Sequence, residues 1–279
     1  MKTILVPTDF SSEADNALAS AHSLASKIDA EIILLNIIED PYIDSIKTIG
    51  ESHYDPMEQV FVIKLIEKTK EKLQAIIDNE IYSDISITYK LEIGNAYNLI
   101  TKHIASNKVD LIVMGTKGAH GLMELLVGSL TDKVVRYAKC PVITVKKCRD
   151  ISNVQNIVFA TALRDDEAEV VESLKAFQEI FGAKLHMLKA YDSNWINPSE
   201  MEALMKKYIE KFGIENYTIN VDHDSDQSHA IMKFAQSIDA DMIAMGAHDR
   251  HGLLHLLAGH VSKDVVNHAH RPIWTKAIR

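Results

Sequence analysis

The stretch that decides the fold is Val109-Asp110-Leu111-Ile112-Val113-Met114-Gly115-Thr116-Lys117-Gly118, followed after nine further residues by Gly128-Ser129. An apolar run bounded by glycine is typical of a strand that is buried on both faces of a sheet. We expect a strand over Leu111–Met114, a glycine-bearing loop behind it and a helix over Leu130–Tyr137. Strand, loop and helix in this order form the unit from which parallel sheets are wound.

The same alternation of short apolar runs and amphipathic stretches extends over the first half of the chain. Further strands are expected at Thr3–Pro7, Glu31–Ile37, Ser86–Glu92 and Val142–Val145, and helices over Ser12–Ala25 and Met57–Ile77. Such alternation predicts an α/β fold, in which a mainly parallel sheet carries helices on both faces.

The chain also repeats itself. The run Ile4–Phe10 returns as Ile157–Leu163, a shift of 153, and His120–Gly128 returns as His251–Gly259, a shift of 131. The second copy has therefore lost 22 residues, which we assign to the polar connection that follows the second strand. We predict two tandem doubly wound domains, at residues 1–147 and 152–279, each with a five-stranded sheet.

Composition limits the classes of function. A formal net charge of -9 argues against binding to nucleic acid or to an anionic membrane, because phosphate groups recruit clusters of Lys and Arg. Neither a membrane-spanning run nor a signal peptide is evident, so we expect a cytoplasmic protein. Cys140 and Cys148 lack metal-ligand spacing, and we interpret both as reduced and incidental.

The glycines predict an anion site. Ser129 with Asp132 three residues later matches a capping box, which would place a helix N-terminus and its positive dipole end beside the turn at Gly115. Glycine at 115, 118 and 128 would let ligand oxygens approach the amides. The alternative is that each glycine only serves a turn or cap. Two common phosphate motifs, GxxxxGK[ST] and GxGxxG, are absent.

The pattern Gly115-x2-Gly118-x9-Gly128-Ser129 resembles that of the universal stress protein family, in its ATP-binding branch. The opening segment Val6–Ser11 and the closing segment Ala138–Val145 are also similar to those of the family. The resemblance covers the whole chain as two domains in tandem, and it implies a Rossmann-like fold.

The resemblance also implies a role for each matching residue. Pro7 and Asp9 would lie at the adenosine, and the main chain at Ile37 would bind the adenine edge. The glycines already named and Ser129 would hold the phosphates, with Mg²⁺ shared with the phosphate oxygens, while Met114 and Leu130 would line the pocket. For Asp9 an alternative remains, which is that it only caps the first helix.

The second copy departs from this pattern. Asp249 replaces Gly118, His260 replaces Ser129, Ala162 replaces Asp9 and Ala160 replaces Pro7. A carboxylate beside a phosphate costs on the order of 1 to 4 kcal/mol, so we predict that the second domain does not bind ATP in the usual manner. A metal site is an alternative for the cluster of His248, His251, His255 and His260, although His251 matches His120 and is better explained as inherited loop structure.

These observations favour a nucleotide-binding regulator in stress response, with ATP in the first domain and slow or no hydrolysis. One alternative is an ATP hydrolase or adenylyl-transferring enzyme. Another is a nucleotide-free scaffold with a metal or other ligand in the second domain. The resemblance further implies that the domains pair through their last strands as an intramolecular pseudo-dimer. A homodimer of whole chains and an unnamed protein partner stay open.

Overall fold

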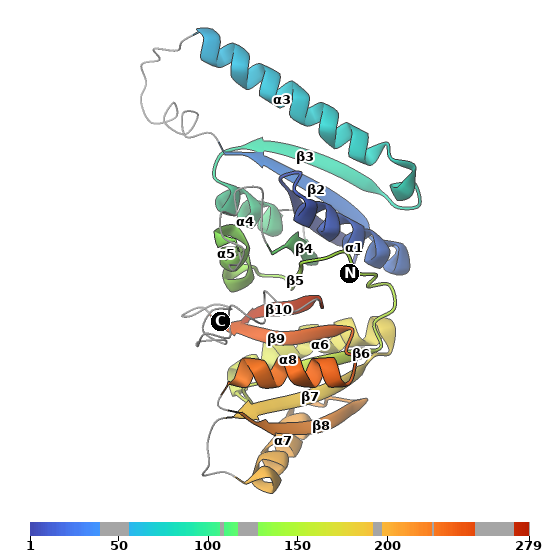
Figure 1. The fold of residues 1–279 in the computed structure, drawn as a ribbon, viewed down its shortest axis with the longest axis vertical. Coiled ribbons are helices and arrows are strands. Elements are labelled where there is room, and N and C mark those ends of the chain that lie inside the picture. Colours follow the sequence, from blue (N-terminus) through green and yellow to red (C-terminus); the bar gives the residue numbers. More distant parts are fainter. Residues whose placement is uncertain are drawn as a thin grey trace.

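The computed structural model describes residues 1–39, 56–106, 109–116, 128–191, 197–224, 226–248 and 271–278. Within these ranges the molecule is elongated, and the two halves of the chain follow each other along its long axis (Figure 1). The first half contains β1 (Thr3–Thr8), α1 (Ser12–Ile28), β2 (Glu31–Ile38), α3 (Pro56–Ile77), β3 (Ile87–Ile93), α4 (Ala96–Ser106), β4 (Leu111–Gly115), α5 (Ser129–Tyr137) and β5 (Val142–Val145).

The second half repeats this succession of strands and helices. It contains β6 (Asn156–Ala160), α6 (Ala168–Phe181), β7 (Lys184–Tyr191), α7 (Pro198–Phe212), β8 (Tyr217–His223), α8 (Gln227–Ser237), β9 (Met242–His248) and β10 (Ile273–Ile278). Two short 3-10 turns, Glu80–Tyr82 and Asp165–Glu167, complete the described elements. The strands and helices expected from the sequence are therefore present, with ends that differ by a few residues.

The described strands form one sheet of ten, in the order β3-β2-β1-β4-β5-β10-β9-β6-β7-β8. Neighbouring strands within each half are parallel, and only the join between β5 and β10 is antiparallel. The prediction of an α/β fold with two doubly wound units is confirmed. The expected two five-stranded sheets are continuous with each other, because the last strand of each half pairs with that of the other.

The repeat is visible in the strand register. Thr3 pairs with Glu31 in the first half, and Asn156 pairs with Lys184 in the second, so both strands keep the shift of 153. Helix α3 has 22 residues and α7 has 15. The shortening of the second copy thus includes its helix, and the expectation that it lies in the polar connection alone is wrong.

Two apolar layers cover the sheet. One contains Leu24 and Leu34 of the first half with Phe159, Phe177 and Trp274 of the second. The layer on the opposite face, under α4, α5 and α8, is built from residues of both halves in the same way; among them are Leu5, Ile112, Val135, Val158 and Ile243. Each layer is continuous across the join, so the strand pairing is supported by buried apolar surface on both faces.

The segment between the two halves is docked on α1. The amide of Arg149 donates to the hydroxyl of Ser20 at 3.1 Å, and that of Ile151 donates to the hydroxyl of Ser23 at 3.0 Å. Ile151 and Val154 are each only 1% exposed. The connection is therefore packed into the apolar layer that both halves share.

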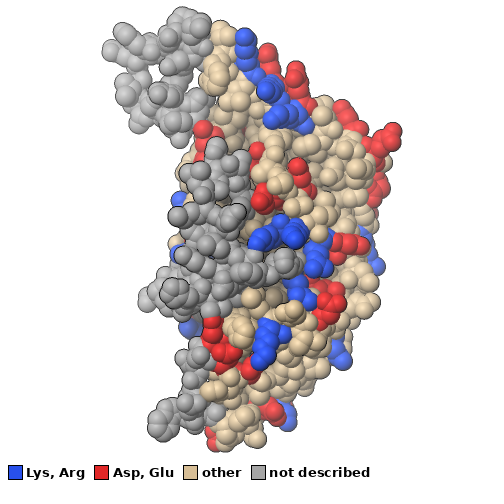
Figure 2. Space-filling model, in the orientation of Figure 1, with Lys and Arg blue, Asp and Glu red and all other residues tan. Residues whose placement is uncertain are grey.

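The face of the molecule shown in Figure 2 is mixed in charge. Basic and acidic side chains are interspersed over the face of the molecule in Figure 2. Among the helices that the structure describes, none combines the length and apolar character that crossing a membrane requires.

Candidate functional site

The order of the strands reverses at β1, which lies between β2 and β4. Ile4 pairs with Leu111 and Leu5 with Ile112, so the carboxyl ends of β1 and β4 lie side by side. Ligands of open α/β sheets bind in the crevice outside such a reversal. This topology brings the predicted residues Pro7, at the end of β1, and Gly115, at the end of β4, to the same edge of the sheet.

The turn after β1 is held by its own side chains. Phe10 has a positive φ of 62°, and its amide donates to the hydroxyl of Thr8 at 3.1 Å. Asp9 is exposed, and its Oδ1 accepts from the amide of Ser11 at 3.0 Å and from its hydroxyl at 2.5 Å. Ser11, whose hydroxyl accepts from the amide of Ala14, is the N-cap of α1. The alternative that Asp9 caps the first helix is therefore wrong, although Asp9 steadies the residue that does.

The reason for glycine at 115 lies in helix packing. A Cβ on Gly115 would come within 2.8 Å of the carbonyl oxygen of Glu13, in the first turn of α1. Real Cβ atoms do not approach backbone so closely, and any larger residue would push α1 away from β4. The expectation that the missing side chain at Gly115 leaves room for ligand oxygens is corrected accordingly.

The start of α5 is tied to the end of β4. The amide of Gly128 donates to the carbonyl of Thr116 at 2.8 Å, and the hydroxyl of Thr131 donates to the carbonyl of Gly115 at 3.0 Å. Helix α5 begins at Ser129, and its N-cap is Gly128, which provides no side-chain cap. The first-turn amides of this helix therefore lack a side-chain cap, and its positive dipole end lies at the strand reversal.

The capping box predicted for Ser129 and Asp132 is wrong. Ser129 is the first residue within the helix rather than its N-cap, and its side chain is exposed. Asp132 instead forms an ion pair with Arg136 one turn later, at 2.8 Å, on the side of the helix.

The predicted apolar walls lie on one face of the sheet. Met114 is 4% exposed, and Ile37 and Leu130 pack as half-buried residues against the same apolar layer, together with Tyr97 of α4. Gly118 lies outside the described residues, as do the neighbouring positions 117 and 119–127. Eight of the nine predicted site residues are thus placed, all of them near the carboxyl ends of β1, β2 and β4 or at the start of α5.

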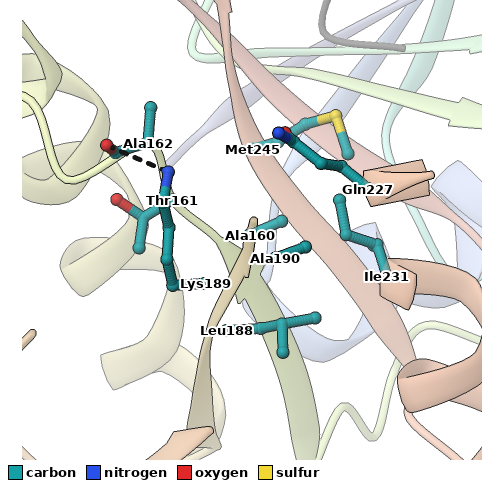
Figure 3. A pocket seen from close by; sticks show the side chains of 9 residues that line it. All are labelled: Ala160, Thr161, Ala162, Leu188, Lys189, Ala190, Gln227, Ile231 and Met245. Carbon is teal, nitrogen blue, oxygen red and sulfur yellow. Dashed lines mark hydrogen bonds between the residues drawn. The ribbon is translucent and has the colours of Figure 1, made fainter. Parts of the chain in front are cut away.

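The second half carries a pocket at the corresponding edge, where β6 lies between β7 and β9 (Figure 3). Its lining comes from three strand ends and from α8: Ala160, Thr161, Ala162, Leu188, Lys189, Ala190, Gln227, Ile231 and Met245. The repeat spacing maps Asn36 onto Lys189 and Ile37 onto Ala190, which is the signal by which Lys189 could have been found from the sequence.

A buried carboxylate next to this pocket was missed by sequence reasoning. Glu167 is 2% exposed, and its oxygens accept from the hydroxyl of Thr161 at 2.6 Å and from that of Tyr208 at 3.0 Å. They also accept from the amides of Ala162 and Arg164 at 3.1 and 3.2 Å. Burial, and then the negative charge of Glu167, raises the pKa of Tyr208 well above its usual value. Glu167 therefore fixes the turn after β6, as Asp9 does after β1 by other contacts.

A metal site was the alternative expectation for the histidine cluster of the second copy. The side chain of His248 and all of Asp249, His251, His255 and His260 lie outside the described residues. Within the part of the chain that the structure describes, no group of three or more His, Cys, Asp or Glu side chains is arranged to hold a metal ion.

Comparison with known proteins identifies relatives of both halves. A model of the universal stress protein family matches residues 1–146 and again 153–275. A universal stress protein of Methanocaldococcus jannaschii is 30% identical over 147 residues, which are 52% of this chain and 82% of that protein. A putative universal stress protein of Staphylococcus aureus strain USA300 is 28% identical over 165 residues, or 59% of this chain and 95% of that protein.

Solved structures share the fold over the whole chain. The crystal structure of a universal stress protein from Archaeoglobus fulgidus superimposes with a TM-score of 0.73 at 21% identity, and covers 99% of this chain and 96% of that one. A putative universal stress protein from Pseudomonas aeruginosa superimposes with a TM-score of 0.60 at 17% identity, and covers 100% and 94%.

Proposed function

Because this chain belongs to the universal stress protein family, with two copies of its domain in tandem, we propose that the first domain binds ATP and that the nucleotide controls how the chain meets a partner in the stress response. The observation that carries the proposal is the start of α5. Its uncapped first turn is held against the end of β4 through the contacts of Gly128 with Thr116 and of Thr131 with Gly115. An uncapped helix N-terminus at a strand reversal is suited to phosphate.

The residues around this helix end fit a nucleotide. The half-buried side chains of Ile37 and Leu130 offer an apolar wall to a purine, beside the buried Met114. In our proposal the main chain at Ile37 binds the adenine edge, and Asp9 lies at the ribose, where a carboxylate can accept from a hydroxyl. In the proposal the amides of Ser129 and Leu130 face the phosphates, and Gly118, which lies outside the described residues, contacts them as well.

The amide of Gly128 has a structural role instead of a ligand-binding one. It already donates to the carbonyl of Thr116, so in the proposal it orients the first turn of α5 and leaves phosphate binding to the amides that follow. A Mg²⁺ ion would be held chiefly by the phosphate oxygens, since it keeps most of its ligands from substrate and water.

The proposal includes slow or no hydrolysis. Among the described carboxylates at this edge, Asp9 accepts from the amide of Ser11, and Glu13 accepts from the hydroxyl of Ser12 at 2.9 Å. A general base must be within reach of the water it activates, and neither carboxylate is arranged as one of a pair for this task. ATP would therefore act as a bound signal rather than as a substrate.

The second domain is proposed not to bind ATP in this manner. Ala162 stands where the first domain has Asp9, and the amides of Ala162 and Arg164 are occupied by the carboxylate of Glu167. A negative charge buried at this point opposes a nearby triphosphate. Because β5 and β10 pair inside one chain, we infer that the two domains act as an intramolecular pseudo-dimer. We expect the protein to reside in the cytoplasm.

Two substitutions at equivalent positions of the repeat test the proposal. Gly128 has a φ of -57°, which a valine can adopt, so Gly128→Val leaves the backbone unstrained while placing a branched side chain at the proposed phosphates. We expect mass spectrometry of denatured protein to detect retained ATP in the unmodified chain and none in this variant. Gly259→Val, at the matching position of the second copy, is the control and retains it. Loss of nucleotide in the control variant, or its retention in both, would contradict the proposal.

A further inference from the structure

A groove on the outer side of the second domain shares no lining residue with the pocket of Figure 3. It lies between the turn after β6 and helix α7, which is at the end of the molecule opposite α3 (Figure 1). Its lining consists of Leu163, Asp165, Leu204, Lys207, Tyr208 and Lys211, and all six belong to the described part of the chain.

The size of the groove limits what it can hold. It has a volume of about 210 Å³ and is open to solvent. Pockets that enclose whole cofactors or drug-sized ligands measure roughly 300 to 1,000 Å³. The groove is therefore matched to a single large side chain, of the kind by which one protein anchors itself on another.

The floor of the groove is apolar. Leu204 is 48% exposed, and Leu163 is half-buried. Tyr208 is only 5% exposed, and its hydroxyl donates to Glu167 at 3.0 Å, so its ring is the part that an occupant can contact. A large apolar side chain placed over these residues would remove apolar surface from water.

The side of the groove that the turn forms is rigid. Leu163 has a positive φ of 60°, which is uncommon for a residue with a Cβ. Its amide donates to the hydroxyl of Thr161 at 2.9 Å, and the amides of Ala162 and Arg164 donate to Glu167. Leu163 is thus held in place before anything binds, which lowers the entropic cost of binding.

The charges on the rim favour an acidic occupant. Lys211 forms an ion pair with Asp165 at 2.6 Å, so these two charges offset each other. Lys207 lies one turn before Lys211 and is exposed, and among the described residues no carboxylate is within ion-pair distance of it. The rim therefore has one uncompensated positive charge beside an apolar floor.

The first domain shows which side chain suits this place. Phe10 stands where the second domain has Leu163, and the Nζ of Lys72 of α3 lies 4.9 Å from the centroid of its ring. A lysine of the helix thus covers an aromatic ring of the turn, which is a favourable contact. In the second domain the ring is missing, while α7 still brings lysines to the turn.

We propose that this groove docks an acidic segment of a partner protein through one aromatic side chain. The ring rests on Leu163, Leu204 and Tyr208, and Lys207 attracts both the ring and the carboxylates that flank it in the partner's segment. The inference goes beyond the proposed function and does not require that the first domain bind ATP.

Three peptides with acetylated and amidated ends serve as probes: Asp-Glu-Trp-Glu-Asp, its uncharged analogue Asn-Gln-Trp-Gln-Asn, and Asp-Glu-Ala-Glu-Asp, which lacks the ring. NMR of methyl-labelled leucine follows their binding, because Leu163 and Leu204 line the groove and Leu130 belongs to the first domain. We expect the acidic tryptophan peptide to shift the signals of Leu163 and Leu204 and not that of Leu130.

The affinities should follow both features of the groove. The acidic tryptophan peptide should bind about two- to fivefold more tightly than its uncharged analogue at low salt, and added salt should reduce this difference. It should bind at least about tenfold more tightly than the alanine peptide, because the ring is the anchor.

Two substitutions separate the floor from the charge. Leu163→Phe takes its residue from the first copy, where Phe10 has a φ of 62° in the same turn, and by filling the groove it should weaken binding of the acidic tryptophan peptide at least about tenfold. Lys207→Gln should remove the preference for the acidic peptide over the uncharged one. Lys206→Gln is the matched control, since Lys206 is exposed on the same helix outside the lining, and it should keep that preference.

Unchanged thermal unfolding establishes that the variants fold, and Leu204→Ala, at an exposed position, replaces Leu163→Phe if the latter does not. Undiminished peptide binding to the floor variant, or shifts confined to other leucines, would overturn the inference. Equal affinities for the acidic and the uncharged peptide at low salt, or equal effects of Lys206→Gln and Lys207→Gln, would do the same.

Two further results would assign the groove to another occupant and so contradict the proposal. Indole-3-acetate that binds as tightly as the acidic tryptophan peptide would show a small-molecule site. Shifts of Leu204 on concentrating the chain alone would show that a second copy fills the groove.

Discussion

Ile143 of β5 lies directly opposite Trp274 of β10, and the two residues hold the same position in the two copies of the repeat. The flanking pairs follow the same symmetry: Thr144 faces Ile273, and Val142 faces Thr275. The strand register at the join is therefore that of a two-fold symmetric interface centred on this pair. The two copies of the repeat form the two sides of this interface.

Trp274 is the largest fully buried side chain at this centre, and it packs near Phe177 at 6.5 Å between ring centroids. Trp274→Ala should lower the free energy of unfolding by about 3 to 5 kcal/mol, because it leaves a cavity in both domains' shared layer. The indole Nε1 has no hydrogen-bond partner in the described structure, so Trp274→Phe should cost clearly less. Guanidinium unfolding followed by circular dichroism measures both, and a loss below about 1 kcal/mol for Trp274→Ala would refute a continuous core.

The buried carboxylate of Glu167 gives a second prediction. Tyr208→Phe removes one hydrogen bond to a charged group and should cost about 1.5 to 3 kcal/mol. Glu167→Ala should cost more, about 1 to 3 kcal/mol for each of the hydroxyls of Thr161 and Tyr208 that it leaves without a buried partner. The double variant should cost less than the sum of the two, because the residues share one network. Additive losses in chemical unfolding would show that the network is not formed.

The two cysteines should differ in reactivity. Burial raises the pKa of Cys140 to about 11, whereas Cys148 is exposed. The thiolate is the reactive form, so at pH 8 about one Cys140 in a thousand is reactive, and it is also shielded. Iodoacetamide should add one label per folded chain by intact mass, and Cys148→Ser should remove it. Rapid addition of two labels to the folded protein would contradict this burial.

His186 should make stability depend on pH near neutrality. Its ring nitrogens contact Thr218 at 2.9 Å and Asn156 at 3.0 Å, and burial followed by the charge of Lys184 lowers its pKa. A lowered pKa favours the neutral ring in the folded state, so its contribution is present above the ordinary pKa of about 6.5 and is lost as the pH falls through the lowered value.

The free energy of unfolding should therefore fall between pH 7.5 and pH 5, and less steeply in His186→Gln, which keeps polar contacts without a titration. Lys184 on the same strand and the ring of Phe234, at 6.4 Å, are the groups that face His186 and stay unchanged in that variant. Identical pH profiles for the two proteins would disprove the assignment.

The fold could be predicted from the sequence because its signals are local or repeated. Buried strands such as Leu111–Gly115 are continuous apolar runs, and the constant shift of 153 carries the assignment of β1 and β2 to β6 and β7. The start of α5 could not be predicted in the same way. Ser129 and Asp132 match a local capping pattern, but hydrogen bonds to the end of β4 make Gly128 the cap instead.

The burial of Glu167 also could not be predicted from local sequence signals. Glu167 ends the acidic run Asp165-Asp166-Glu167, which by composition belongs on the surface. Its burial depends on Tyr208, which is 41 positions away in the sequence and reaches it from α7. Tertiary partners at such distances decide which polar residue is enclosed, and neither periodicity nor local spacing contains that information.

The central claim is that the two copies of the domain, joined through Ile143 and Trp274, differ in their ligands. Calorimetric titration of the unmodified chain with ATP and Mg²⁺, after removal of any retained nucleotide, tests it most directly. One ATP bound per chain, and none in Gly128→Val, is the predicted result. Two equivalent ATP sites per chain, or one that survives in Gly128→Val, would contradict it.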